Sequence, residues 1–295
     1  MRIFQTITFN ATSSLRENRT WYNNLYEPLI DMGHDVYLLP ADAGREAMLQ
    51  SNSFLRDKFS DKLISIFKRE HKRKPFNCFF SYLCDGMINC SVIDQICEMG
   101  VITCNFSCNN THQFELVKEI SPHYNINLHS EKNSALKFNS IGANPLWWPM
   151  ASNPNYYFPN NLKKEIDVSF VGGNYPPRAE YIKYLFDNHV DVQIFGSGWP
   201  YYQSSSKIRS NIKRYIRWIK SNFSISPSRR LRERAELNYV KITKEINKQS
   251  PNRIHSIISD HELINLYSRS KLSLGILEVY ENHNPSLRLR KHLHL

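Results

Sequence analysis

Hydrophobic and polar positions alternate along the first half of the chain with two different periods. Short runs rich in β-branched and aromatic residues are followed by stretches in which apolar residues recur every three or four positions, as on one face of a helix. The runs that predict strands are 2–9, 34–40, 77–82, 101–106 and 126–129. The helical periods cover 20–32, 58–72, 92–99, 114–120 and 130–140. Strands that alternate with helices are typical of an α/β fold with a doubly wound parallel sheet.

A change of composition separates this half from the next. Residues 144–154 contain three prolines and two tryptophans, and proline disrupts both helices and strand ladders. We therefore expect a linker here, with one domain at 1–150 and a second at 151–295. The alternation then resumes, with strands expected at 166–171, 190–195, 252–257 and 271–276 and helices at 178–188 and 260–270. A basic, helical insertion at 203–250 interrupts the second domain.

The formal net charge of +11 is concentrated in that insertion, because Lys207 to Lys248 holds thirteen Lys or Arg against three Glu. Within 207–223, apolar residues fall on one face of a predicted helix and basic residues surround them. The apolar positions are Ile208, Ile212, Tyr215, Ile216, Ile219 and Phe223. A cationic helix of this kind suits the surface of an anionic membrane. A solvated helix that packs on its own domain is the alternative.

The remaining composition narrows the class of protein. The six cysteines lie between Cys78 and Cys108, without a Cys-x-x-Cys pair or a histidine pair at zinc-finger spacing, so we expect reduced thiols and no metal site. The sequence has no run of about 18 apolar residues, and its start reads as a first strand rather than a signal peptide. We expect a cytoplasmic protein that contacts membranes at their surface through 207–223.

Three loops of the second domain lie where a ligand would bind in an open α/β sheet, after the carboxyl ends of strands. The first holds Gly172, Gly173 and Asn174 and is followed by Arg178; the second holds Gly196, Ser197 and Gly198; the third precedes the helix at Asp260. Glycine lets backbone amides approach a phosphate, and arginine adds positive charge. None of these loops matches a P-loop or Gly-x-Gly-x-x-Gly, so ordinary tight turns are the alternative. Three such loops in order favour a nucleotide site.

The first domain offers two catalytic candidates. His112 lies in a polar run, 105–113, that follows a strand, and its imidazole suits a general base because its usual pKa is near neutrality. Asn109 to Thr111 in the same run could instead cap the next helix. Asp85 also follows a strand and could act on an acceptor or cap a helix.

Four stretches, 105–122, 141–153, 167–173 and 262–275, together resemble the CgeB-like (spore-maturation-protein-like) glycosyltransferases, which are related to group 1 transferases. The resemblance implies the GT-B fold, with two Rossmann-like domains. It implies that the second domain holds a nucleotide-sugar donor and the first an acceptor, which would be a glycan, a lipid-linked group or a protein. It further implies that no metal and no cofactor is needed, since the nucleotide sugar is a co-substrate.

The resemblance weakens near residue 288. Similar proteins have an Arg-x-Arg-Asp-x-Glu type of run there, and Arg288 and Arg290 match its beginning and would face the diphosphate. Lys291 to Leu295 follow instead of the acidic pair. We therefore expect a second Rossmann-like domain that is incomplete, or truncated, at its C-terminus, with a divergent tail as the alternative.

Three functions remain open from the sequence. The first is a metal-independent glycosyltransferase that moves a sugar from the donor to an acceptor hydroxyl. The second is a catalytically inactive remnant that keeps the fold. The third is a nucleic-acid binder that acts through 207–248. It ranks last because the rest of the chain is nearly neutral and carries no nucleic-acid-binding motif, so we expect no specific nucleic acid as a partner.

Overall fold

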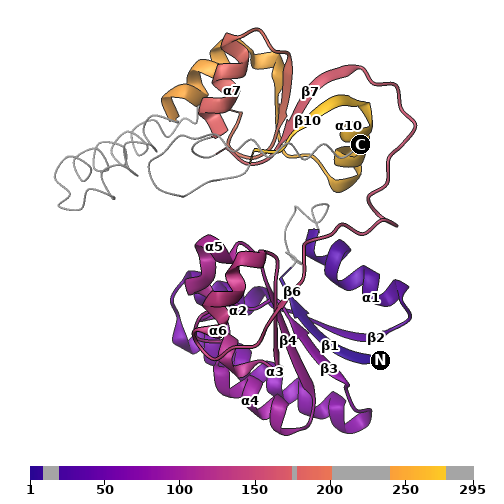
Figure 1. Ribbon diagram of the computed structural model, residues 1–295, viewed down its shortest axis with the longest axis vertical. Coiled ribbons are helices and arrows are strands. Elements are labelled where there is room, and N and C mark those ends of the chain that lie inside the picture. The colour runs from indigo at the N-terminus through magenta and orange to yellow at the C-terminus, as the bar shows by residue number, and fades with distance from the viewer. Residues whose placement is uncertain (9–19, 175–177, 201–239, 277–295) are drawn as a thin grey trace, which may run out of the picture. The chain divides into compact units, whose positions relative to one another are not determined.

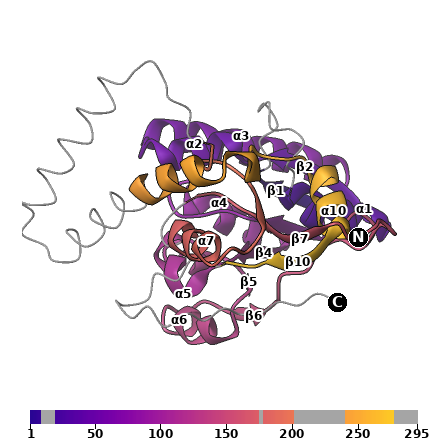
Figure 2. The ribbon, with the colours of Figure 1, turned by 90° about the horizontal axis from the view of Figure 1, so that it is seen from above.

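The computed structural model describes residues 1–8, 20–174, 178–200 and 240–276. The chain forms two compact units, Met1–Phe158 (unit 1) and Pro159–Leu295 (unit 2), and each contains its own parallel sheet. Figure 1 shows both units, and Figure 2 shows them from a second direction.

The sheet of unit 1 has six parallel strands in the order β2-β1-β3-β4-β5-β6. The strands are β1 (Arg2–Ile7), β2 (Asp35–Pro40), β3 (Cys78–Ser81), β4 (Ile102–Ser107), β5 (Ile126–His129) and β6 (Pro145–Trp147). Phe4 of β1 pairs with Phe79 of β3, and their neighbours Gln5 and Phe80 pair in the same register. Because successive side chains point to opposite faces, β1, β2 and β3 each contribute to two separate cores.

Most helices of unit 1 pack on the face that carries Phe4 and Phe79. They are α2 (Asp42–Leu49), α3 (Ser53–Arg73), α4 (Cys90–Glu98) and α6 (Ala135–Asn139), with the 3-10 turn η2 (Phe114–Leu116). The short helix α5 (Asn110–Gln113) and the 3-10 turns η3 (Ser121–His123) and η4 (Lys132–Ser134) complete the unit. The ring of Phe4 lies 5.1 Å from that of Phe67 in α3 and 5.8 Å from that of Phe79. All three side chains are fully buried, so this aromatic cluster is the centre of the main core.

The opposite face of the same sheet is covered more sparsely. A π-helical turn, η1 (Tyr22–Tyr26), continues directly into α1 (Glu27–Asp31), which has Pro28 in its first turn. Leu25 of η1 packs with Ile3, Ile7 and Phe80, and its carbonyl accepts a hydrogen bond of 2.9 Å from Gln5 Nε2. In Figure 1, α1 lies on one side of the sheet, and α5 and α6 lie on the other.

Unit 2 has a four-stranded parallel sheet in the order β10-β7-β8-β9. Its strands are β7 (Ile166–Val171), β8 (Val192–Phe195), β9 (Ile254–His255) and β10 (Ser270–Leu274), and its helices are α7 (Arg178–Asp187), 240–249, η5 (Pro251–Arg253) and α10 (Asp260–Arg269). Phe170, Ile194 and Ile182 form one core with α7 and 240–249. α10 starts with a capping box between Ser259 and Glu262 and lies on the other side of the sheet (Figure 1).

The structure confirms the predicted class, two Rossmann-like α/β units with parallel sheets. Three local predictions were wrong. Residues 42–49, for which nothing was predicted, form α2; the predicted helix 114–120 is only the turn η2; and the predicted linker contains β6, which pairs with β5. Pro145 is tolerated there because it begins an edge strand, where its missing N–H removes no ladder bond.

No helix within the described ranges is long and apolar enough to cross a bilayer. The predicted membrane-contacting segment 207–223 lies outside those ranges, and its contact with an anionic membrane stays a prediction.

The aromatic cluster predicts a large difference between two equivalent substitutions. Phe4→Ala should lower the free energy of unfolding by about 3–5 kcal/mol, because it opens a cavity in a closely packed core. Phe54→Ala should lower the free energy of unfolding only slightly, since that ring is 71% exposed. Urea denaturation of both variants checks this. Equal losses would show that the Phe4 cluster is not the centre of stability.

Candidate functional site

The two glycine-containing loops predicted in unit 2 lie side by side at the carboxyl edge of its sheet. Gly172 N donates a hydrogen bond of 2.9 Å to Phe195 O, and Asn174 N donates one of 2.8 Å to Ser197 O. These bonds continue the β7–β8 ladder beyond the ends of both strands. The structure therefore brings together Gly172, Gly173, Asn174, Gly196, Ser197 and Gly198.

Gly196 is required by the close approach of these two loops. It adopts a φ of +147°, and a Cβ atom at this position would lie 2.2 Å from the carbonyl oxygen of Gly172. No side chain fits at that distance, and L-residues rarely adopt this φ. The backbone of one loop thus packs directly on the backbone of the other.

The buried side chain of Trp199 anchors the second glycine loop to the first. Its side chain is fully buried, its Nε1 donates a hydrogen bond of 2.7 Å to Gly172 O, and its ring meets Phe170 edge-to-face at 5.9 Å. An indole that anchors both loops was not predicted from the sequence. The only signal was its position directly after Gly196–Gly198.

Helix 240–249 supports the same edge through two polar side chains, neither of which was predicted. Asn174 Nδ2 donates hydrogen bonds to Gly198 O (3.0 Å) and to Thr243 Oγ1 (2.8 Å). Asn247 Nδ2 donates one of 2.8 Å to Trp199 O. The spacing of four between Thr243 and Asn247 places them on one face of a helix, which was the signal available. Asn174 Oδ1 is buried and has no hydrogen-bond partner among the described residues.

Arg178, the first residue of α7, reaches the junction between the loop after β7 and the residues after β10. Its Nη1 donates a hydrogen bond of 3.0 Å to Gly173 O, and its Nε donates one of 3.0 Å to Ile276 O. Its guanidinium carbon lies 5.5 Å from the centre of the Phe170 ring. A positive side chain and the N-terminal end of α7 therefore lie beside the glycine loops, and both favour an anion.

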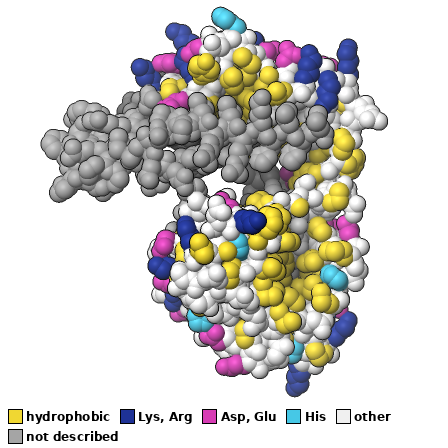
Figure 3. All heavy atoms as spheres, in the orientation of Figure 1, with side chains coloured by type: hydrophobic (Ala, Val, Ile, Leu, Met, Phe, Trp, Pro, Cys, Tyr) yellow, Lys and Arg dark blue, Asp and Glu magenta, His cyan; other side chains and the backbone are white. Residues whose placement is uncertain are grey.

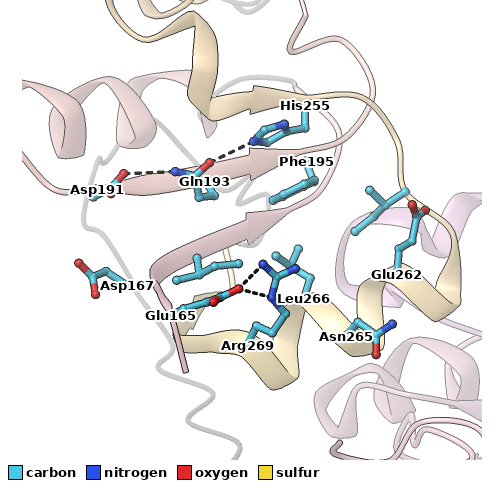
Figure 4. Close-up of a pocket in the computed structure, with 12 residues that line it drawn as sticks. Glu165, Asp167, Asp191, Gln193, Phe195, His255, Glu262, Asn265, Leu266 and Arg269 are labelled. Carbon is cyan, nitrogen blue, oxygen red and sulfur yellow. Dashed lines mark hydrogen bonds and ion pairs between the residues drawn. The ribbon is translucent and has the colours of Figure 1, made fainter. Parts of the chain in front are cut away.

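A separate groove of about 490 Å³ lies between α10 and one face of the unit 2 sheet (Figure 4). His255 Nε2 donates to Gln193 Oε1 (3.0 Å), and Gln193 Nε2 donates to Asp191 Oδ1 (3.3 Å). The ring of Phe195 stacks on His255 at 4.4 Å. Burial lowers the pKa of the His255 imidazole below its usual value, which favours the neutral ring with its proton on Nε2.

The charged residues of this groove are paired with one another or with neighbours. Glu165 pairs with Arg269, and Asp167 pairs with Lys271 at 2.6 Å. Asp191 also contacts Arg253 at 3.0 Å. None of the predicted glycine-loop residues lines the groove. We therefore take the carboxyl edge, where Arg178 and the N-terminal end of α7 meet the two glycine loops, as the candidate site.

In unit 1, the carboxylate of Asp85 accepts hydrogen bonds from the backbone of the turn that follows η2. Its carboxylate oxygens accept hydrogen bonds from Glu119 N (3.0 Å) and Ile120 N (2.9 Å). Burial raises the pKa of this carboxyl above its usual value, and the two backbone amides act in the opposite direction. These two amides belong to the turn between η2 and η3 and not to the first turn of a helix, so both the helix-capping and the catalytic role of Asp85 stay predictions.

His112 lies in α5, between the carboxyl ends of β4 and β5, and its side chain is outside the described part of the structure. Asn109 precedes α5 in a left-handed conformation with φ +58° and makes no capping hydrogen bond with its side chain. Instead, Thr111 N donates to Glu131 Oε2 (2.5 Å), and Lys137 Nζ donates to Thr111 O (2.7 Å). These contacts fix the backbone of α5 at the sheet edge.

Two further predictions, the diphosphate-binding arginines and the independence from metal ions and cofactors, are not tested by the described residues. Arg288 and Arg290 lie outside them. Within them, no group of three His, Cys, Asp or Glu side chains is arranged to hold a metal ion, and the six cysteines are free thiols. Independence from metal ions and from cofactors stays a prediction.

Comparison with known proteins adds little beyond the fold. No family model matches the sequence, and no curated protein matches it. Among solved structures, a chain of the glycosylation-associated protein (Gap123) complex from Streptococcus agalactiae is similar over 72% of this chain, with a TM-score of 0.36 and 11% sequence identity. The similarity covers 41% of that chain. We draw no conclusion about function from a likeness of this size.

The contact between the two loops predicts that Gly196→Ala lowers the free energy of unfolding by about 2 kcal/mol or more, because the added methyl group collides with Gly172 O in a strained conformation. Gly275→Ala is the matched control, since a Cβ there meets no atom within 4 Å. Urea denaturation measures both. Similar stability of the two variants would contradict the close packing.

Proposed function

We propose that the carboxyl edge of unit 2 binds the diphosphate of a nucleotide sugar, and that the protein transfers the sugar to an acceptor hydroxyl. The observation that carries this proposal is the position of Arg178. Two backbone carbonyls hold its guanidinium beside Gly172–Asn174, at the N-terminal end of α7. Planar guanidinium groups bind phosphate oxygens through paired N–H donors.

The glycine loops suit a phosphate for a second reason. Because Gly196 packs directly on Gly172, a ligand can approach main-chain groups that side chains would otherwise cover. Asn174 Oδ1 is a buried acceptor with no partner in the part of the chain that the structure describes, and a ligand donor such as a ribose or sugar hydroxyl would satisfy it. Leaving such an atom unpaired costs about 1–3 kcal/mol.

The proposed reaction is a substitution at the anomeric carbon. A bond forms between that carbon and the acceptor oxygen, and the bond from the same carbon to the diphosphate breaks. The acceptor proton passes to a base, for which His112 is the proposed group. Arg178 and the N-terminus of α7 would stabilise the negative charge that develops on the nucleoside diphosphate as it leaves, without a metal ion.

Binding can be tested separately from catalysis. Arg178→Gln should weaken binding of uridine or guanosine diphosphate by about 10- to 100-fold in calorimetric titration, the effect of losing a charge-assisted hydrogen bond of about 1.5–3 kcal/mol. Lys183→Gln is the control, because it also removes one positive charge from α7. In the wild-type protein Lys183 pairs with Asp187 at 2.6 Å instead of facing the glycine loops. If both variants bound the nucleoside diphosphate with equal affinity, Arg178 would not be part of the binding site.

Transfer is tested by the release of nucleoside diphosphate from a panel of nucleotide sugars with glycan, lipid-linked and protein acceptors. We expect release by the wild-type protein and a loss of about 100-fold or more in His112→Ala, the range of general-base catalysis. Binding without release by a folded sample would identify the inactive remnant instead. Salt-sensitive binding of DNA or RNA without nucleotide binding would favour the nucleic-acid alternative.

A further inference from the structure

The groove between α10 and the sheet of unit 2 is not part of the proposed donor site, since none of the glycine-loop residues lines it. Side chains alternate along a strand, so Gln193 and Phe195 of β8 form its floor, while Ile194 between them points into the core on the other face. One face of α10 forms its wall, through Glu262, Asn265, Leu266 and Arg269. The volume of about 490 Å³ is that of a small-molecule site, for which about 300–1,000 Å³ is usual.

A chain of hydrogen bonds fixes the floor of the groove, and Figure 4 shows three of its members in line. Arg253 pairs with Asp191, which accepts a hydrogen bond from Gln193 Nε2. Gln193 Oε1 in turn accepts one from His255 Nε2. Because a carbonyl oxygen only accepts, the proton of the neutral His255 ring lies on Nε2 and its Nδ1 atom is an acceptor. Burial lowers the pKa of this imidazole, which keeps the ring neutral at pH 7.

The charges that line the groove are already compensated. Of the four carboxylates that line it in the described part of the chain, three pair with a basic side chain. The fourth, that of Glu262, accepts hydrogen bonds from Ser259 at the N-terminal end of α10, which favours a negative charge. The three pairs are Glu165–Arg269, Asp167–Lys271 and Asp191–Arg253.

This balance of charge argues against a strongly charged ligand. Among the described residues, the groove offers neither a phosphate nor a polycation a set of unpaired opposite charges. On the face of unit 2 that Figure 3 shows, acidic and basic side chains likewise lie close together. A neutral ligand therefore suits the groove best.

What remains for such a ligand is a set of uncharged donors and acceptors beside an aromatic surface. Gln193 and Asn265 supply amide groups, and His255 supplies its Nδ1 acceptor. The rings of Phe195 and His255 stack at 4.4 Å, with 18° between their planes, and form a flat apolar surface next to these groups. A hydroxyl group both donates and accepts hydrogen bonds. A carbohydrate carries several hydroxyls around a ring whose C–H face is apolar, so it matches both parts of the groove.

We propose that this groove binds a neutral oligosaccharide, with sugar hydroxyls hydrogen-bonded to Gln193 and His255 and a sugar ring packed against Phe195. The sugar is bound there and not transformed, so the site does not depend on the proposed transfer. Because the floor is fixed by its own hydrogen bonds, few side chains lose freedom on binding. The side chains of the Glu165–Arg269 pair and of Asp191 are 46–50% exposed. The ligand therefore stays partly in water, and its affinity is about millimolar.

Binding is measured by NMR titration of the wild-type protein with four neutral trisaccharides: maltotriose, cellotriose, mannotriose and chitotriose. Each is added to about 10 mM, beyond the millimolar affinity expected. At least one should bind and shift the ring resonances of His255, whereas those of His189, exposed just after α7, should not move. No binding of any of the four would overturn the proposal, as would a shift at His189 with none at His255.

A matched pair of variants tests the position of the site. Gln193→Leu should weaken the binding of the trisaccharide at least tenfold, because it keeps a similar volume but removes the amide that contacts the sugar and orients His255. Gln50→Leu is the control, since Gln50 also donates to a carboxylate, at 2.9 Å to Glu46, but lies in unit 1. Equal affinities of the two variants would place the binding site elsewhere. The titration of the wild-type protein does not depend on the folding of either variant.

Two further measurements separate this site from other readings of the groove. Inorganic phosphate and spermidine should neither shift His255 nor displace the trisaccharide; displacement by either would show that the groove binds a charged ligand instead. Gln193→Leu should bind uridine diphosphate as the wild-type protein does. Trisaccharide binding without nucleotide binding would reject the proposed donor site alone, and nucleotide binding without trisaccharide binding would reject the groove alone.

Discussion

The structure depends on one constraint: successive strands of a parallel sheet can pair only if the chain crosses over a face of that sheet between them. In both units every described strand pair is parallel, so each connection must return along one face. Two consequences follow. Helices must cover the faces, and all strands end at the same edge. The first consequence produces the aromatic core around Phe4, and the second gathers the loops of the candidate site.

In unit 2, the edge formed in this way is stabilised by main-chain contacts. Gly196 lies against Gly172 O, the indole of Trp199 bonds to the same carbonyl, and Asn174 links the first loop to helix 240–249. Arg178 adds its charge to an edge that these contacts already fix. A site built from backbone groups is arranged before its ligand arrives, which lowers the entropic cost of binding.

The fold class could be predicted from the sequence because its strands are compact apolar runs separated by helical periods. α2 could not, since residues 42–49 contain Gly44 and their two large apolar residues, Met48 and Leu49, are adjacent rather than three or four positions apart. Packing places this helix, with Gly44 close against Phe59. The glycine positions of the site could also be predicted, because they follow strands directly. Trp199, Thr243 and Asn247 could not, because their contacts depend on where helix 240–249 packs.

The need for crossover connections also explains why the two faces of the unit 1 sheet are packed unequally. Each crossover must choose a face, and most of those in unit 1 run over the face of Phe4. That choice buries one side deeply. On the other side Trp21 and Trp148 pack on Phe106 of β4, while Ile102 of β4 and Leu146 of β6 are each 54% exposed. Burying an exposed apolar side chain contributes about 25 cal/mol for each Å² removed from water. The second face, where Ile102 and Leu146 keep half of their surface in water, therefore contributes less to stability than the face of Phe4.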